Sequence, residues 1–67
     1  MISFKPFWDT LDLKDISTYT LIKEHHISNS TINRLRRNKA ISTVTLDKLC
    51  KILGCTVWDI MEFKSDK

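Results

Sequence analysis

The chain has 67 residues and a formal net charge of +3, from 11 Lys and Arg against 8 Asp and Glu. This length makes one domain, which we assign to residues 1–67, and it leaves no room for a deep catalytic cleft. The single Gly and single Pro leave few of the turns that β-hairpins need, so an all-α fold of short helices is favoured. Cys50 and Cys55 are too few for a disulfide scaffold, and no signal peptide or long apolar run precedes them. We therefore expect a reduced, cytoplasmic setting and no membrane partner.

Apolar residues at three- and four-residue steps predict a first helix over residues 5–13, where Pro6 suits the opening turn. Its aromatic side chains, Phe4, Phe7 and Trp8, have the spacing that a buried helix face requires. We therefore interpret this stripe as part of the core and not as a ligand pocket.

The remaining predicted helices each follow a hydroxyl side chain that can cap a helix start. The capping residues are Ser17, Ser28, Ser42 and Thr56, ahead of predicted helices over 18–25, 29–37, 43–53 and 57–62. Gly54 is a helix-stopping residue at the end of the fourth helix. The second helix is too short to be stable alone, so it must dock through Leu21 and Ile22. Residues 64–67 are expected to form a frayed tail.

Four of the cationic residues lie in a stretch that contains no acid. This stretch, between Glu24 and Asp47, holds Arg34, Arg36, Arg37 and Lys39, and the rest of the chain is slightly acidic. Phosphate backbones attract such a patch, because each cation that neutralises a phosphate releases condensed counterions. A solvated helix end favoured by the macrodipole would look the same on charge alone. Charge therefore leaves both interpretations open.

The predicted helix over 29–37 adds a chemical signature to this charge. Advancing 100° per residue from Ile32 places hydroxyl and guanidinium groups opposite the core, with the amides of Asn29 and Asn33 on one shoulder of that face. Base edges in a major groove present donors and acceptors that Asn and Arg can meet with paired hydrogen bonds. Two short helices separated by three or four residues, the second with such a face, are the arrangement of a helix-turn-helix. The candidate base contacts are Asn29, Ser30 and Asn33.

The alternative is that these polar residues are only turn and cap residues, as most Asn and Ser near helix starts are. Ser28 fits that interpretation. Asn is a mediocre helix former, and Ala, Glu or Lys would serve a merely solvated surface better. For Asn29 and Asn33 the balance therefore favours a functional role.

The segment from Ser17 to Met61 resembles the Cro/cI-type helix-turn-helix, also called the XRE family. The residues that carry the resemblance are Leu21-Ile22, the turn His25-His26-Ile27, the stretch Ser28 to Leu35, and the block Leu46 to Met61. The whole chain is most similar to short bacterial and phage regulators with an aromatic-rich first helix. The resemblance implies a compact five-helix bundle of the phage-repressor type, in which the helices over 18–25 and 29–37 form the DNA-binding unit.

The resemblance also implies a set of DNA phosphate contacts around the base-reading residues. By position these are Thr18, Arg34, Arg36, Arg37, Asn38 and Lys39. Thr18 stands where the family commonly has Gln, and Arg36 where it often has Glu. His26 stands where the interhelical turn often has Gly. His tolerates a left-handed backbone better than most non-Gly residues, so we expect the turn to be retained.

These observations predict a sequence-specific double-stranded DNA-binding transcriptional regulator, expected to act as a repressor, in a bacterial cell or a phage-infected bacterium. We expect a homodimer that is weak or that forms only on DNA, since no added dimerisation segment is evident. No nucleophile arrangement, metal-ligand spacing or Gly-rich loop occurs, so no enzyme, metal, cofactor or small-molecule ligand is expected. The alternative from another class is a helical protein-interaction module, antitoxin-like or an oligomer subunit. It would use the aromatic first helix, if Phe4, Phe7 and Trp8 exceed what a small core can bury.

Overall fold

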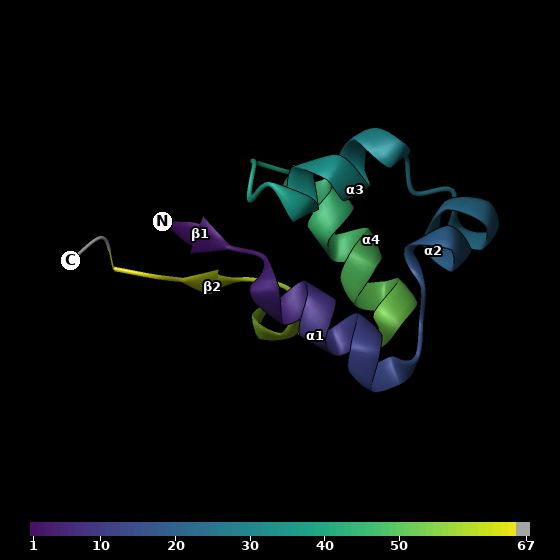
Figure 1. The fold of residues 1–67 in the computed structure, drawn as a ribbon, viewed down its shortest axis with the longest axis horizontal. Helices are drawn as coiled ribbons and strands as arrows, with labels where there is room; N and C mark the ends of the chain where they lie inside the picture. Colours follow the sequence, from purple (N-terminus) through teal and green to yellow (C-terminus); the bar gives the residue numbers. More distant parts are fainter. Residues whose placement is uncertain (66–67) are drawn as a thin grey trace.

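The computed structural model describes residues 1–65 and gathers four helices around one core (Figure 1). The helices are α1 (Lys5–Lys14), α2 (Thr18–His25), α3 (Asn29–Arg36) and α4 (Thr43–Leu53). A 3-10 turn, η1 (Val57–Asp59), and two short strands, β1 (Ile2–Ser3) and β2 (Glu62–Phe63), complete the chain. The expected all-α fold class is confirmed, with a two-stranded sheet added at the chain ends. Compared with the sequence-based bounds, α1 runs one residue further and α3 ends one residue earlier.

Three of the helices begin with the same Ser-x-x-Thr cap. At Ser17, Ser28 and Ser42, the serine Oγ accepts the backbone N–H of the threonine three residues later, at 3.1 Å in each case. The two hydroxyl oxygens of each cap also lie 3.0–3.1 Å apart. Each cap satisfies one of the N–H groups that the first helical turn leaves unpaired, which stabilises a helix by about 1 kcal/mol. These caps fix where α2, α3 and α4 start.

Left-handed residues end three of the helices. Asp15 (φ 55°) follows α1, His26 (φ 59°) follows α2, and Gly54 (φ 61°) follows α4. Gly is the residue that adopts this backbone at no steric cost, and a Cβ added at Gly54 would meet no atom within 4 Å. Gly is therefore favoured at position 54 by the left-handed backbone and not by a lack of room for a side chain.

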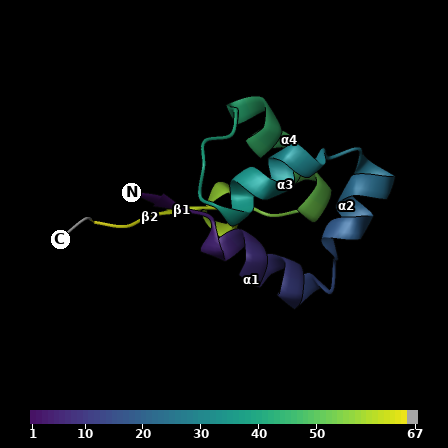
Figure 2. The ribbon, with the colours of Figure 1, turned by 45° about the horizontal axis from the view of Figure 1, so that its top comes forward.

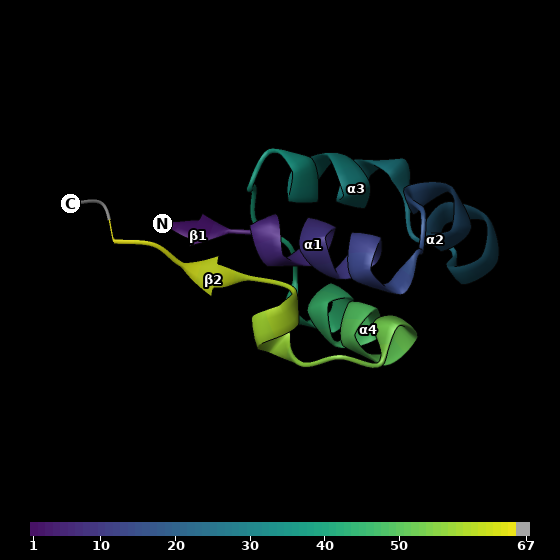
Figure 3. The same cartoon turned by 60° about the horizontal axis from the view of Figure 1, so that its bottom comes forward.

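The core is built from one apolar side of every helix. Its fully buried side chains include Phe7, Leu21, Leu35, Leu49 and Ile60, each 0% exposed. Helix α1 crosses the molecule with α3 on one side and α4 on the other (Figure 3). No helix in the described part of the chain is both long and apolar enough to cross a membrane.

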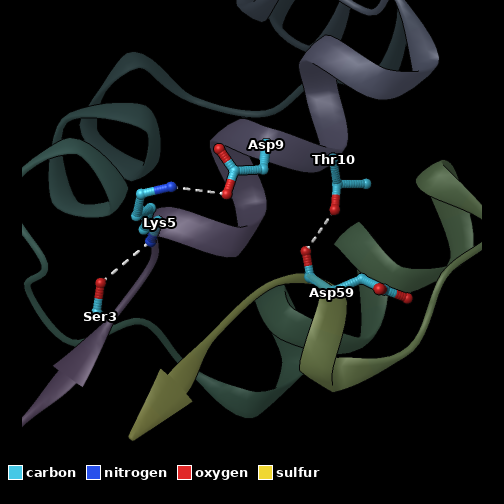
Figure 4. Close-up of polar contacts among 5 residues, drawn as sticks. All are labelled: Ser3, Lys5, Asp9, Thr10 and Asp59. Atoms are coloured by element: carbon cyan, nitrogen blue, oxygen red, sulfur yellow. Dashed lines mark hydrogen bonds and ion pairs between the residues drawn. The ribbon is translucent and has the colours of Figure 1, made fainter. Parts of the chain in front are cut away.

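The fifth helix predicted over 57–62 is wrong. Only Val57–Asp59 form a 3-10 turn, and Glu62 already belongs to β2. Helix α1 holds this turn through two backbone carbonyls: Thr10 Oγ1 donates to the Asp59 carbonyl at 2.7 Å (Figure 4), and the Phe7 N–H donates to the Ile60 carbonyl at 3.1 Å. Glu62 then pairs with Ser3 in the ribbon, so the chain is extended where the predicted helix would continue.

The two strands form an antiparallel ribbon between the chain ends. Ile2 pairs with Phe63 and Ser3 with Glu62. The ladder continues to Lys64, whose N–H donates to the Met1 carbonyl at 2.7 Å and whose carbonyl accepts from the terminal amine. The first part of the tail expected to fray over 64–67 is therefore paired, and residues 66–67 lie outside the described residues. Figure 2 shows this ribbon projecting from the helical body.

Candidate nucleic-acid interface

Helices α2 and α3 are joined by a tight turn that fixes the angle between them. His26 takes the left-handed conformation at the end of α2, as its substitution for Gly predicts. Ile27 is 4% exposed, and its N–H donates to the Leu21 carbonyl at 3.1 Å. A buried side chain in the turn thus holds both helices against the core, and Ser28 then caps α3.

Helix α3 has an apolar side and a polar side. Ile32 and Leu35 are buried, at 3% and 0% exposure, and anchor the helix to the core. The opposite surface carries side chains that are all exposed: Asn29, Ser30, Asn33, Arg34 and Arg37. The structure therefore brings the three predicted base-contact residues and two of the predicted phosphate-contact residues onto one accessible face.

Among residues 1–65, the cations around this face have no acidic partner. Within residues 1–65 the ion pairs that can be described join Lys5 to Asp9 at 2.9 Å on α1 and Lys51 to Asp47 at 3.0 Å on α4. Figure 4 shows the first of these pairs on α1. No carboxylate of the described residues lies within 4.0 Å of the cationic groups of Arg34, Arg36, Arg37 or Lys39. An incoming phosphate would thus meet cations without first breaking an ion pair.

Arg36 differs from its neighbours because its guanidinium lies over an aromatic ring. Its Cζ is 5.2 Å from the centroid of the Trp8 ring on α1, which is the geometry of a cation–π contact. Its Nη1 also makes a long contact of 3.5 Å with Oδ1 of Asn33. Arg36 therefore connects α1 to the polar face of α3. Its predicted contact with phosphate stays a prediction.

Asn38 also has a structural partner. Its backbone is left-handed (φ 56°), and its side-chain Oδ1 accepts the N–H of Phe4 at 2.8 Å across 34 positions of sequence. The next residue, Lys39, donates its N–H to the Arg34 carbonyl at 2.8 Å, which closes the turn after α3. Asn38 thus ties the end of α3 to the start of α1. Whether it also touches phosphate is an untested prediction, as it is for Lys39.

Thr18 is the first residue of α2, and its side chain is half-buried. It stands one residue after the Ser17 cap, at the helix end that carries the positive pole of the macrodipole. This position is compatible with its predicted contact to a phosphate.

Sequence reasoning missed the roles of Trp8 and Phe4 next to α3. Trp8 was interpreted only as core, whereas it is half-buried and carries Arg36 on its ring. The contacts join residues 28 and 34 positions apart, and no local pattern links such positions. The only sequence signal was the presence of an Arg and an Asn where a solvated helix end would tolerate many residues.

The structure weakens the premise of the protein-interaction alternative. Phe4 and Phe7 are 3% and 0% exposed, and Trp8 is half-buried with Arg36 over its ring, so the aromatic first helix exposes little aromatic surface. The exposed aromatic side chains lie elsewhere, at Tyr19, Trp58 and Phe63.

The two thiols are free, and burial, with smaller effects from Cys50 and Asp59, raises the pKa of Cys55. A raised thiol pKa lowers the fraction of reactive thiolate. Within residues 1–65, no three His, Cys, Asp or Glu side chains gather as metal ligands would.

A capped, cation-rich second helix on a tight interhelical turn defines a helix-turn-helix domain. The chain matches the family model of the Cro/C1-type HTH DNA-binding domain over residues 7–66, and it belongs to this family. It is thus a DNA-binding protein and not an enzyme. The crystal structure of the transcriptional regulator VanUg (Form II) is similar, with a TM-score of 0.83 and 30% sequence identity over 91% of this chain and 81% of that chain. No curated protein gives a significant match.

Proposed function

We propose that this protein is a sequence-specific transcriptional repressor that inserts α3 into the major groove of double-stranded DNA. The observation that carries the proposal is the exposed polar face of α3, flanked by cations that no described carboxylate neutralises. The similarity to VanUg, a transcriptional regulator, supports a regulatory role for the DNA binding.

The contacts on this face are divided into base contacts, which give specificity, and phosphate contacts, which give affinity and position. Asn29, Ser30 and Asn33 read base edges, because Asn can make paired hydrogen bonds to adenine in the major groove. The phosphate contacts come from Thr18, Arg34, Arg36, Arg37, Asn38 and Lys39. They position α3 in the groove and supply most of the affinity.

Arg36 contributes to DNA binding in a second way, besides its phosphate contact. With its guanidinium over Trp8 and its Nη1 beside Asn33 Oδ1, it limits the rotamers of the Asn33 amide before DNA arrives. A pre-oriented amide loses less side-chain entropy on binding, which favours specific sites.

The test is selection of bound sequences from a random duplex pool, followed by titration of the selected site at several salt concentrations. We expect one selected motif and a slope of log K against log salt of about −0.9 per phosphate contacted. Flat salt dependence, or a pool that yields no motif, would contradict the proposal. Repression is tested with a reporter gene that carries the selected site at its promoter: the protein should lower expression, and the Asn33→Ala variant should lower it less.

A further inference from the structure

The end of α4 brings the two cysteines of the chain together. The helix ends at the left-handed Gly54, and the N–H of Cys55 then donates to the Cys50 carbonyl at 3.1 Å. A hydrogen bond between residues five apart, across a left-handed residue, defines the Schellman type of helix end. The side chains at its first and last positions commonly contact each other. In this chain those two positions are Cys50 and Cys55.

Helix α1 ends in a similar way and shows what these positions hold when they serve packing alone. After the left-handed Asp15, the N–H of Ile16 donates to the Leu11 carbonyl at 3.0 Å. Leu11 is buried and Ile16 packs against the core, so two apolar side chains close this helix end. At the end of α4 both side chains carry a thiol, and both are free and only half-buried. The pair is therefore accessible to a small reagent.

The two thiols are close enough to affect each other. Burial is the main cause of the raised pKa of Cys55, and the neighbouring Cys50 is the next cause, with a weak hydrogen bond between the two side chains as a smaller one. The Cα atoms of a disulfide usually lie about 4.4–6.8 Å apart. The direct backbone hydrogen bond between Cys50 and Cys55 is compatible with this separation.

We propose that Cys50 and Cys55 form a modification site, a dithiol that a disulfide oxidant such as oxidised glutathione converts into an intramolecular disulfide. The thiolate of one cysteine attacks the S–S bond of the oxidant, which forms a mixed disulfide and releases one glutathione thiolate. The thiolate of the other cysteine then attacks the protein sulfur of the mixed disulfide and releases the second glutathione. The protein loses two electrons and two thiol protons, the oxidant gains the electrons, and the two released thiolates take up the protons.

The new bond links the last turn of α4 to the loop that enters η1 (Figure 3). It spans residues that the backbone hydrogen bond already joins, so the native helix end needs no rearrangement, while the unfolded chain loses conformational freedom. Because the pKa of Cys55 is raised, little thiolate is present at neutral pH and the exchange is slow. The equilibrium, and not the rate, is therefore the quantity to measure.

The test is equilibration of the full chain in glutathione redox buffers, under native conditions and in concentrated urea, followed by acid quenching and intact-mass spectrometry. The disulfide is detected as the loss of two hydrogen atoms with no glutathione attached. We expect the native chain to form it at least about tenfold more favourably than the unfolded chain, because only the folded helix end holds the thiols together. By thermodynamic linkage, oxidation should then raise the midpoint of thermal unfolding by roughly 5–10 °C.

Three variants serve as controls. Cys50→Ser and Cys55→Ser should each carry at most one glutathione and show no rise in the unfolding midpoint on oxidation. The double variant Cys50→Ser with Lys51→Cys keeps two cysteines at nearly the same spacing, but places one of them at an exposed position of α4. Its disulfide should form no more favourably in the native chain than in urea.

Equal disulfide formation in the native and the unfolded wild type, or a glutathione on each cysteine of the native chain, would overturn the proposal. Cys50 and Cys55 would then only pack, as Leu11 and Ile16 do. A native preference shared by the double variant would equally refute the assignment to this helix end. The measurement contains no DNA, so its outcome is independent of the proposed function.

Discussion

The guanidinium of Arg36 rests on the ring of Trp8, with 5.2 Å between Cζ and the ring centroid. The Trp8 ring in turn meets the fully buried ring of Phe7 edge-on, at a centroid distance of 4.9 Å and an interplanar angle of 80°. A continuous line of contacts therefore runs from the core through α1 to the last turn of α3. Helix α3 thus contacts a helix outside the helix-turn-helix itself.

This contact predicts energetic coupling between the two residues. In a double-mutant cycle of Trp8→Leu and Arg36→Gln, urea unfolding should give a coupling free energy of about 0.5–1 kcal/mol, the strength of a partly exposed cation–π pair. Trp58 is 75% exposed and does not contact Arg36, so the cycle of Trp58→Leu with Arg36→Gln is the control and should give no coupling. Additive effects in both cycles would show that the Trp8 contact contributes nothing.

Asn33 and Arg37 should affect DNA binding in different ways. Asn33→Ala should relax the preference at about one base pair and cost roughly 1–3 kcal/mol on the selected site, with little effect on random duplex. Arg37→Ala should weaken selected and random duplex alike and reduce the salt slope by about one unit. Both are measured by competition binding at two salt concentrations. Identical behaviour of the two variants would refute the assignment of Asn33 to base contact and of Arg37 to phosphate contact.

Asn38 should contribute to the stability of the fold as well as to DNA binding. Asn38→Ala loses both the acceptor for the Phe4 N–H and the tolerance of a left-handed backbone, so the free energy of unfolding should fall by about 1–3 kcal/mol. Asn38→Asp keeps both properties and should fold like the wild type. It also places a negative charge next to Lys39, so it should bind DNA less tightly at low salt. If Asn38→Ala unfolded like the wild type, the bond to Phe4 would have no structural weight.

Asp59 predicts a loss of stability in acid. Its carboxylate accepts the backbone N–H and the hydroxyl of Thr56, both at 3.1 Å, and these hydrogen bonds lower the pKa of Asp59. A carboxyl whose pKa is lower in the folded state stabilises the fold above its unfolded pKa of about 3.9, and this contribution is lost as pH falls through the folded pKa. Urea unfolding between neutral pH and pH 3 should therefore show a steeper loss for the wild type than for Asp59→Asn. Parallel profiles for the two proteins would contradict this assignment.

Local chemistry made the helical part of the fold predictable. Ser17, Ser28 and Ser42 mark the starts of α2, α3 and α4, because a cap acts within three residues and is visible in the sequence. His26 was likewise predictable, since its backbone demand is set by the turn it occupies. The exposed face of α3 followed from helix geometry and one buried residue, Ile32.

What the sequence did not predict depends on contacts between distant residues. A helix over 57–62 fits the local pattern, yet Glu62 pairs with Ser3 from the other end of the chain and is extended. The ribbon has the same origin, because β1 and β2 are each two residues long and lie at opposite ends of the chain. The partners of Arg36 and Asn38 were also hidden, since cation–π contacts and side-chain caps at such separations leave no periodic signal.

The pairing of Met1 with Lys64 means that the backbone enters and leaves the domain at a single point. The two ends of the described fold therefore lie side by side in the β1–β2 ribbon. Adjacent ends suit insertion of the domain into a surface loop of a host protein. They also suit circular permutation, in which a short linker joins the ends and the chain is cut in another loop. A cut in the exposed loop after α3 should leave Asn38 in place, because its side chain accepts the N–H of Phe4 and holds the loop against the start of α1.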